Sequence, residues 1–198
     1  WVMNDHKGFF AMMARMKYIE RWALMRNSVS ENICEHSLEV AMLAHGLGII
    51  GRKRFGKDLS PERLAMLGMY HDCTEIITGD MPTPVKYAND ELKEAYKAIE
   101  DSAAQRLLEM LPEDLRAEYE SYFLPEQITP EEYRYVKAAD KLSALIKCIE
   151  EEKTGNQEFR SAKQATYESL QQMNMPEVTV FCEAFLPEYY KTLDELEH

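Results

Sequence analysis

The chain has 198 residues, of which 45% are hydrophobic and 29% are charged, and its net charge is −12. This composition supports a packed core of about one domain and excludes an intrinsically disordered chain. The apolar runs are short and interrupted by charges, so the sequence predicts no membrane-spanning helix and no membrane partner.

The acidic balance also argues against a nucleic-acid polymer as partner, because proteins that grip a phosphate backbone usually present a basic stripe. The nearest basic cluster is Arg52-Lys53-Arg54 with Lys57, which we interpret as a solvated loop. The four cysteines form no CxxC pair, and the N-terminus has no secretory pattern. We therefore expect a cytoplasmic location.

Apolar residues recur at helical spacing along the whole chain, and no stretch alternates as a strand would. The expected fold class is all-α, a single-domain helical bundle over residues 1–198. Its core would span about 7–152, followed by C-terminal helices over about 156–196. The expected helices cover about 9–26, 33–50, 61–77, 92–110, 115–123, 130–154, 156–173 and 176–186.

Several helix starts carry capping signals. Asn32 and Glu35 form one capping-box pattern, and Thr129 with Glu132 forms another. Ser60 precedes a proline and an acid, which is typical of a first helical turn. In contrast, residues 51–59 predict a basic loop. Two prolines within residues 78–84 predict an extended loop without helix.

A metal site is indicated by the pair His71-Asp72, late in the third expected helix. An imidazole nitrogen and a carboxylate oxygen can bind one divalent ion together. His36 lies on the apolar face of the second helix, and Asp140 lies on the helix that begins near Thr129. These four residues on three helices would form an open nitrogen and oxygen site, which suits hydrolysis of a phosphate ester.

Each of these ligands also has a simpler interpretation. His36 could be a core histidine bonded to a carbonyl, Asp72 could end its helix, and Asp140 could pair with Lys137. A buried carboxylate without a partner is costly, however. One ion would satisfy Asp72, Asp140 and both imidazoles at once, and we prefer this single cause.

The other histidines leave no second site, because His45 falls on the opposite helix face and His6 and His198 lie near the termini. We therefore expect one divalent metal ion. The absence of thiolate from the ligand set favours Co, Mn, Zn, Ni, Fe or Mg over a structural zinc cage. Four protein ligands in an octahedral shell would leave room for water and for a phosphate oxygen, and Asp72 and Asp140 are expected to contact the substrate as well as the ion.

Two acids follow the His71-Asp72 pair. Glu75 lies one turn after His71 on the same face, and Asp80 lies in the stiff loop. Either could exchange a proton with the attacking water or with the leaving oxygen. Alternatively, Glu75 is a surface acid at a helix end and Asp80 forms a turn.

These residues resemble the HD-domain metal-dependent phosphohydrolases, and most closely the branch of bacterial 5'-deoxynucleotidases. The similarity runs in order over nearly the whole chain, and the stretch 79–86 is far more specific than His-Asp alone. The segments that carry it are Arg21-Trp22 with Arg26-Asn27, Glu35-His36-Ser37, Met69-Tyr70-His71-Asp72, Glu75, residues 78–86, and Val136-Lys137 with Ala139-Asp140.

The resemblance implies an HD-type all-helical fold, a homodimer, and hydrolysis of deoxyribonucleoside 5'-monophosphates to deoxyribonucleoside and phosphate. It implies that the metal ligands are His36, His71, Asp72 and Asp140. It implies a catalytic role for Glu75, with Asp80 as a further candidate. It also implies that Arg21 orients the phosphate and that the nucleoside meets Trp22, Asp80, Met81, Pro82 and Thr83.

From the residues alone, Arg21 and Trp22 look like the polar end of the first helix. An arginine at that point suits the bidentate grip that a phosphate needs. Two rival functions stay open at this stage. One keeps the site but changes the substrate, giving an HD-type phosphodiesterase or alarmone hydrolase. The other is a non-catalytic helical interaction module that a metal braces.

Overall fold

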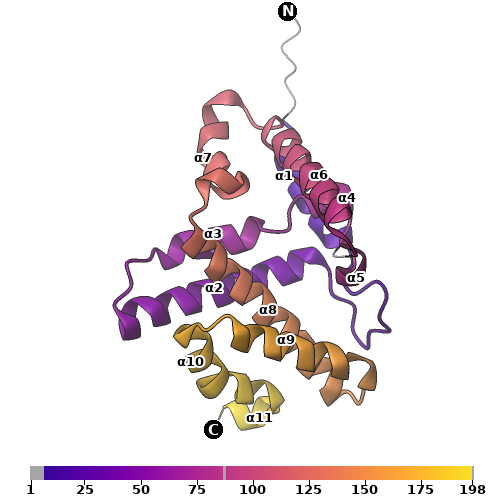
Figure 1. The fold of residues 1–198 in the computed structure, drawn as a ribbon, viewed down its shortest axis with the longest axis vertical. Helices are drawn as coiled ribbons and strands as arrows, with labels where there is room; N and C mark the ends of the chain where they lie inside the picture. The colour runs from indigo at the N-terminus through magenta and orange to yellow at the C-terminus, as the bar shows by residue number, and fades with distance from the viewer. Residues whose placement is uncertain (1–6, 87, 198) are drawn as a thin grey trace, which may run out of the picture.

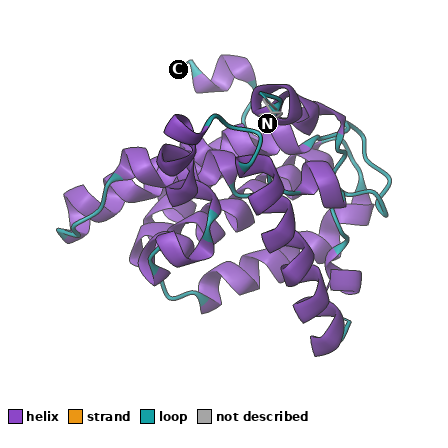
Figure 2. Ribbon diagram, turned by 90° about the horizontal axis from the view of Figure 1, so that it is seen from above, coloured by secondary structure: helices purple, strands orange, loops and turns teal. Residues whose placement is uncertain are grey.

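The computed structural model describes residues 7–86 and 88–197. Within these residues the chain is helical and carries no strand, apart from one isolated bridge between Glu20 and Asn32. Figure 2 shows helices joined by loops, the longest of which covers residues 19–32 and leads into the helix that begins at Ile33. The expected all-α fold class is confirmed.

Three helices form the centre of the fold. α2 (Ile33–Phe55) and α3 (Pro61–Tyr70) lie side by side, and α8 (Pro130–Lys153) crosses them (Figure 1). On one side stand α1 (Phe9–Met13), α4 (Glu75–Thr78), α5 (Thr83–Lys86), α6 (Asp90–Leu108) and α7 (Glu113–Phe123). On the other side lie α9 (Arg160–Gln172), α10 (Pro176–Ala184) and α11 (Leu193–Leu196). Short 3₁₀ turns cover Ala14–Tyr18, Pro125–Gln127, Gln157–Phe159 and Leu186–Tyr190.

The predicted helix starts are confirmed at three places. The Asn32 side chain accepts hydrogen bonds from the backbone of Cys34 and Glu35, and Glu35 completes the capping box. Thr129 and Glu132 form the same arrangement before α8. Ser60 caps α3 through the backbone N–H of Arg63. Each cap satisfies backbone donors that the first helical turn leaves unpaired.

Gly68 allows α2 and α3 to approach closely. A Cβ at this position would lie 3.0 Å from Cα of Ala41, closer than real Cβ atoms normally come to another helix's backbone. The close approach brings the first turn of α2 near the end of α3. The two histidines expected to bind metal are carried by these two segments.

Buried residues form two clusters, one on each side of this centre. One joins α2, α3 and α8 to α9 and α10, with Leu47, Leu142, Ile146 and Leu170 among its most buried members. The other lies around α1, α6 and α7 and contains Phe9. The C-terminal helices share the first cluster with the central ones. The limits of the core at about 7–152 and the tail at about 156–196 stay a prediction.

The predicted first helix is wrong in its length. α1 ends at Met13, a 3₁₀ turn follows to Tyr18, and Ile19 is extended. The reason is long-range pairing, because the carbonyl of Ile19 accepts the backbone N–H of Ile33, and the N–H of Arg21 bonds the Glu31 carbonyl. Local periodicity carries no information on such partners.

The third predicted helix also stops early. α3 ends at Tyr70, residues 71–74 form turns, and α4 resumes at Glu75. The His71 ring donates to the carbonyl of Gly68, which an unbroken α-helix would pair with the N–H of Asp72. The interruption therefore sits at the His71-Asp72 pair itself.

Two predicted loops are partly helical. α2 continues through the basic residues to Phe55 and ends at Gly56, whose φ of 64° suits a glycine C-cap. Arg and Lys are good helix formers and interact favourably with a helix C-terminus. In the second loop, α5 begins at Thr83, since a proline in a first turn breaks no helical hydrogen bond.

α2 has the length and hydropathy of a membrane-spanning helix, which the sequence analysis did not anticipate. Half of its most apolar window is buried inside the fold. The central helix of a globular domain meets the same criteria, so this feature is weak support for a membrane span.

Candidate metal centre and active site

Two histidine rings face each other between α2 and the end of α3, with their centroids 5.2 Å apart. His71 Nδ1 lies 2.7 Å from the Gly68 carbonyl, which can only accept, so this nitrogen carries the proton. His36 Nδ1 lies 2.9 Å from Ser143 Oγ, whose hydroxyl in turn donates to Glu39 Oε2 at 2.5 Å. With Glu39 ionised, Ser143 accepts from His36 Nδ1, so His36 presents an unprotonated Nε2 to the space that His71 Nε2 also faces.

The two predicted aspartates close this space. Asp72 Oδ2 lies 3.1 Å from Nε2 of His71 and 3.5 Å from Nε2 of His36. Asp140 Oδ1 lies 3.3 Å from Nε2 of His36. The ligand atoms of His36, His71 and Asp72 all lie within 4.8 Å of one another. The structure thus brings together all four residues predicted as metal ligands.

The donor atoms fit a divalent ion. Nε2 of both histidines is buried and lacks a hydrogen-bond partner. Leaving such groups unpaired is costly, and a cation between two imidazole lone pairs and two carboxylates would satisfy them together. The set is nitrogen and oxygen without thiolate, as predicted from the sequence.

The charges at this centre are arranged for cation binding. Burial opposes ionisation of Asp72, yet the His71 imidazole holds the pKa of this carboxyl well below its usual range. Burial likewise opposes ionisation of Asp140, while the nearby His36 ring and the ammonium group of Lys137, which pairs with Asp140 at 2.7 Å, lower the pKa of this carboxyl. Burial lowers the pKa of His36 itself, which keeps that ring neutral and able to act as a ligand.

Arg21 and Trp22 lie beside this centre, not at a helix end as predicted from the residues alone. They follow the bridge from Glu20 to Asn32, in the loop that leads into α2. Arg21 Nη1 lies 3.4 Å from Asp72 Oδ2, which places the guanidinium at the edge of the group of candidate metal ligands. Phosphate bound at the ion would therefore meet this fork of N–H donors.

Glu75 is buried, with 6% of its surface exposed, and its Oε2 has no partner. It is therefore not the surface acid of the alternative interpretation. Burial, with the charges of Asp72 and Asp80, raises the pKa of Glu75 to about 10. At neutral pH this carboxyl holds a proton that it can donate.

Asp80 is half-buried, and burial raises the pKa of its carboxyl. Arg21 and the backbone N–H of Trp22 act in the opposite sense, so Asp80 faces the loop that carries them. Met81 and Pro82 follow, half-buried. The side chain of Thr83 lies outside the described residues. Contact of these three with a nucleoside stays a prediction.

Comparison with known proteins identifies relatives over nearly the whole chain. The profile of the 5'-deoxynucleotidase YfbR-like family matches residues 8–189. This chain belongs to that family. A 5'-deoxynucleotidase of Vibrio cholerae is 48% identical over 188 residues, which cover 95% of this chain and 97% of that protein. The 5'-deoxynucleotidase YfbR of Shigella boydii is 46% identical, covering 95% and 94%.

Solved structures show the HD-domain fold for this family member. An HD-domain phosphohydrolase of Listeria innocua superimposes with a TM-score of 0.79 at 22% identity, covering 96% of this chain and 91% of that one. The HD phosphohydrolase DatZ of cyanophage S-2L, solved with dA and one catalytic Zn²⁺ ion, gives 0.64 at 23% identity, with 92% and 96% covered. The predicted HD-type bundle is confirmed.

The sequence analysis missed three residues around the site in this family member: Glu39, Ser143 and Glu31. Glu39 and Ser143 form the chain of hydrogen bonds that orients His36. Glu39 follows His36 by three residues, and Ser143 follows Asp140 by three, so helical spacing could have suggested both. Glu31 contacts Arg21 and Trp22 through the loop, which no spacing rule reveals.

Glu39 gives a prediction on stability. Burial raises the pKa of its carboxyl from 4.5 to about 7, against the hydrogen bond from Ser143. Because the folded pKa is raised, the metal-free wild type should lose stability as pH rises from about 4.5 to about 7. Glu39→Gln cannot ionise. It should therefore be more stable than wild type by about 1–3 kcal/mol at about pH 8, allowing for screening.

Urea unfolding of both proteins in EDTA, at about pH 4.5 and about pH 8, measures this difference. The two proteins should differ little at the lower pH. A gap that stays constant between the two pH values would contradict the raised pKa of Glu39.

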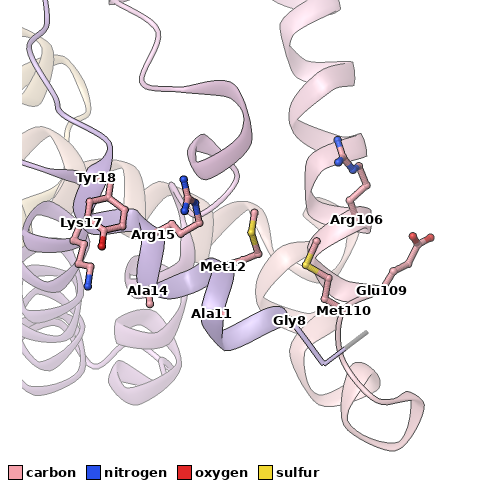
Figure 3. A pocket seen from close by; sticks show the side chains of 10 residues that line it. All are labelled: Gly8, Ala11, Met12, Ala14, Arg15, Lys17, Tyr18, Arg106, Glu109 and Met110. Atoms are coloured by element: carbon pink, nitrogen blue, oxygen red, sulfur yellow. The ribbon is translucent and has the colours of Figure 1, made fainter. Parts of the chain in front are cut away.

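An open hollow of about 680 Å³ lies away from this site, between α1 with its following turn and α6. Met12 and Met110 line it from its two sides (Figure 3). Its lining includes none of the metal or substrate candidates. The unpaired Nε2 atoms of His36 and His71 therefore lie at the His-Asp cluster and not in this hollow.

Proposed function

We propose that this chain is a metal-dependent 5'-deoxynucleotidase that hydrolyses deoxyribonucleoside 5'-monophosphates to deoxyribonucleoside and phosphate. Its family membership supports the activity, and one observation supports the site. That observation is the pair of buried, partnerless Nε2 atoms of His36 and His71 facing Asp72 and Asp140. Burying polar nitrogen atoms without hydrogen-bond partners lowers stability, and a non-catalytic interaction module would gain nothing in return.

His36, His71, Asp72 and Asp140 would hold the ion. A divalent cation supplies charge to a phosphate oxygen and lowers the pKa of a water, toward about 7 in the best zinc cases. The donor set suits Co, Mn, Zn, Ni or Fe, with Mg as a harder candidate. The zinc recorded for DatZ is a reason to begin a metal series with zinc.

The protein's own groups would handle charge and protons. Arg21 would bind the phosphate oxygens that lie on the Asp72 side, where the transition state gathers charge. Glu75 would donate its proton from the carboxyl group to the leaving 5'-oxygen of the sugar. Asp80, facing Arg21, would contact the nucleoside and accept the proton that the attacking water gives up. Trp22, next to Arg21, would lie against the deoxyribose.

Arg21→Lys should lower kcat/KM by about 10-fold or more. Lysine keeps the charge but loses the planar fork that binds two phosphate oxygens at once. Steady-state kinetics on a deoxyribonucleoside monophosphate measure this loss. Arg26→Lys is the matched control, since Arg26 is exposed in the same loop. Equal kinetics for Arg21→Lys and wild type would reduce Arg21 to a general electrostatic role.

Trp22→Ala should narrow the gap between deoxy and ribo substrates and lower activity on the deoxy substrate. An apolar side chain discriminates against an added hydroxyl by a factor of about 10² at best. The deoxy-to-ribo ratio of kcat/KM should therefore fall by no more than about 10² in the variant. Alanine retains a Cβ, and the left-handed backbone at this residue is therefore no more strained than before. The ratio of kcat/KM for one base with both sugars measures the effect. An unchanged ratio would shift selectivity to Asp80 and its neighbours.

A nucleotide panel tests the proposed function against its rivals. The protein, loaded with each metal in turn, is given deoxy and ribo 5'-monophosphates, 3'-monophosphates, diesters and an alarmone. Inorganic phosphate should appear from deoxy 5'-monophosphates first. A phosphodiesterase would instead release monophosphates without inorganic phosphate, and an interaction module would release nothing.

We also propose a homodimer in the cytoplasm. Several large apolar side chains are exposed near the start of α2, and a partner copy would cover them. They are Leu24, Val29, Leu38 and Met42, each more than half exposed. Sedimentation measures the oligomeric state. Leu38→Glu with Met42→Glu should yield a monomer if this face forms the interface, and an unchanged mass would exclude it.

A further inference from the structure

One carboxylate ties the two substrate-facing residues together. Glu31 Oε2 accepts a hydrogen bond from Trp22 Nε1 at 2.8 Å and another from Arg21 Nε at 3.2 Å. The side chains of Arg21 and Glu31 are only 11% and 14% exposed. A charge-assisted bond in such a shielded place is stronger and more directional than one at the surface.

Trp22 needs such a restraint. Its φ is 58°, in the left-handed region that a bulky side chain rarely adopts. The conformation is fixed on several sides. The Trp22 carbonyl accepts from the Met25 backbone and from Asn27 Nδ2, and its ring packs 5.3 Å from that of Phe159. A strained residue that its surroundings hold so firmly points to a function for its side chain.

The bond to Glu31 also changes what the indole can recognise. Trp22 has a single ring N–H donor, and Glu31 already accepts it. The indole therefore meets a sugar as an apolar wall, without a donor for a 2'-hydroxyl. Similarly, Arg21 is held through Nε, while its Nη1 reaches the Asp72 side. Glu31 thus holds the Arg21 guanidinium, which would bind phosphate, and the Trp22 indole, which would contact the sugar, in one fixed arrangement.

The loop does not depend on Glu31 for its fold. Its far end is fastened to α8 by Glu151, which accepts from the backbone of Ser28 and from Asn156 Nδ2. Lys147 donates to the Val29 carbonyl and to Glu151. The Arg21 backbone bond goes to the Glu31 carbonyl, which a side-chain change leaves in place. Replacing the Glu31 side chain should therefore free two side chains without unfolding the loop.

We infer that Glu31 is a positioning residue that sets the preference for deoxyribose by holding Arg21 and Trp22 in one arrangement. The inference rests on the proposed function. Without Glu31 the indole can rotate, and its N–H becomes available to a ribose hydroxyl. The arginine loses its anchor at the same time, so phosphate placement also becomes less exact for the deoxy substrate.

The test compares wild type, Glu31→Gln and Glu31→Ala by kcat/KM on one deoxy and one ribo 5'-monophosphate with the same base. The deoxy-to-ribo ratio should fall about 10-fold in the glutamine variant and further in the alanine variant. Glutamine keeps one oxygen acceptor, which explains the expected order. A loss of folded protein alone lowers both activities equally and leaves the ratio unchanged.

Glu158→Gln is the matched control. Glu158 accepts the backbone N–H of Arg26 in the same loop and is 37% exposed, but contacts neither Arg21 nor Trp22 in the described hydrogen bonds. Its ratio should equal that of wild type. A ratio that falls as far in Glu158→Gln as in Glu31→Gln would overturn a specific role for Glu31.

A second readout needs no activity. Trp22 is one of two tryptophans, so Trp1→Phe makes it the only fluorophore of this kind. In that background, Glu31→Gln should shift Trp22 emission to longer wavelength and increase its quenching by acrylamide. Unchanged emission together with an unchanged ratio overturns the inference. Wild type without deoxynucleotidase activity but with a Trp22 shift in the variant would overturn the proposed function instead.

Discussion

Asp140→Ala is expected to abolish phosphate release while the chain stays folded. Asp140 lies on α8 and faces Nε2 of His36, so its loss removes the candidate ligand that α8 supplies. The remaining three ligands would leave one side of the ion open, and a weakly bound ion is lost on purification. We expect activity at least about 10³-fold below wild type, and the same for Asp72→Ala.

The fold should tolerate this change, because the Asp140 side chain is still 19% exposed and its pairing with Lys137 is a partly exposed i,i+3 ion pair, which contributes little stability. Without the ion, removing one of two adjacent carboxylates also removes a repulsion. Asp101→Ala, at an exposed position of α6, is the control for loss of a carboxylate. Near-wild-type turnover of Asp140→Ala in excess metal would rule out this metal centre.

Glu75→Gln is expected to lower kcat by about 10²–10⁴, the usual range for a general acid or base. Glutamine matches the shape of the protonated carboxyl but has no acidic proton to give. Since the pKa of Glu75 is raised to about 10, the folded chain already holds this side chain uncharged at neutral pH. The variant should therefore fold as well as wild type and keep its metal.

Metal analysis of purified Glu75→Gln separates proton transfer from metal binding. A full site with low turnover supports the proton role. A purified variant without metal would instead indicate that Glu75 is a metal ligand, because its unpaired Oε2 is an oxygen that could also coordinate an ion. Glu62→Gln, a fully exposed acid in the first turn of α3, is the control.

The clustering of the four candidate metal ligands could be predicted from the sequence because the pattern of each is local to its helix. His36 lies on the stripe that leads to Val40, and Ser60 and Thr129 mark where their helices begin. Burial of unpaired carboxylates then argued for a shared ion, and the structure brings the four residues together.

The region around Arg21 could not be predicted in the same way. Its course depends on pairing of Ile19 with Ile33 and of Arg21 with Glu31, across a loop without periodicity. The left-handed backbone at Trp22 is unusual for its residue type and has no sequence signal. For the same reason Glu31 was missed, although it contacts both substrate candidates.

The break between α3 and α4 was missed because it depends on a side-chain hydrogen bond of His71. Its ring takes the Gly68 carbonyl that the helix would otherwise use, which orients Nε2 toward the site. Periodicity of apolar residues continued through Glu75, so the pattern gave no sign of the turn. Local sequence rules failed here because a side-chain hydrogen bond replaces a backbone hydrogen bond of the helix.

Titration of the metal-free protein with a divalent ion tests the central claim most directly. The chain is stripped with a chelator, dialysed, and assayed for phosphate release from a deoxyribonucleoside 5'-monophosphate as metal is added. We predict no release without metal and a linear rise that saturates at one ion per chain. Undiminished phosphate release from the stripped protein, or saturation only at two ions per chain, would contradict a single metal centre at His36, His71, Asp72 and Asp140.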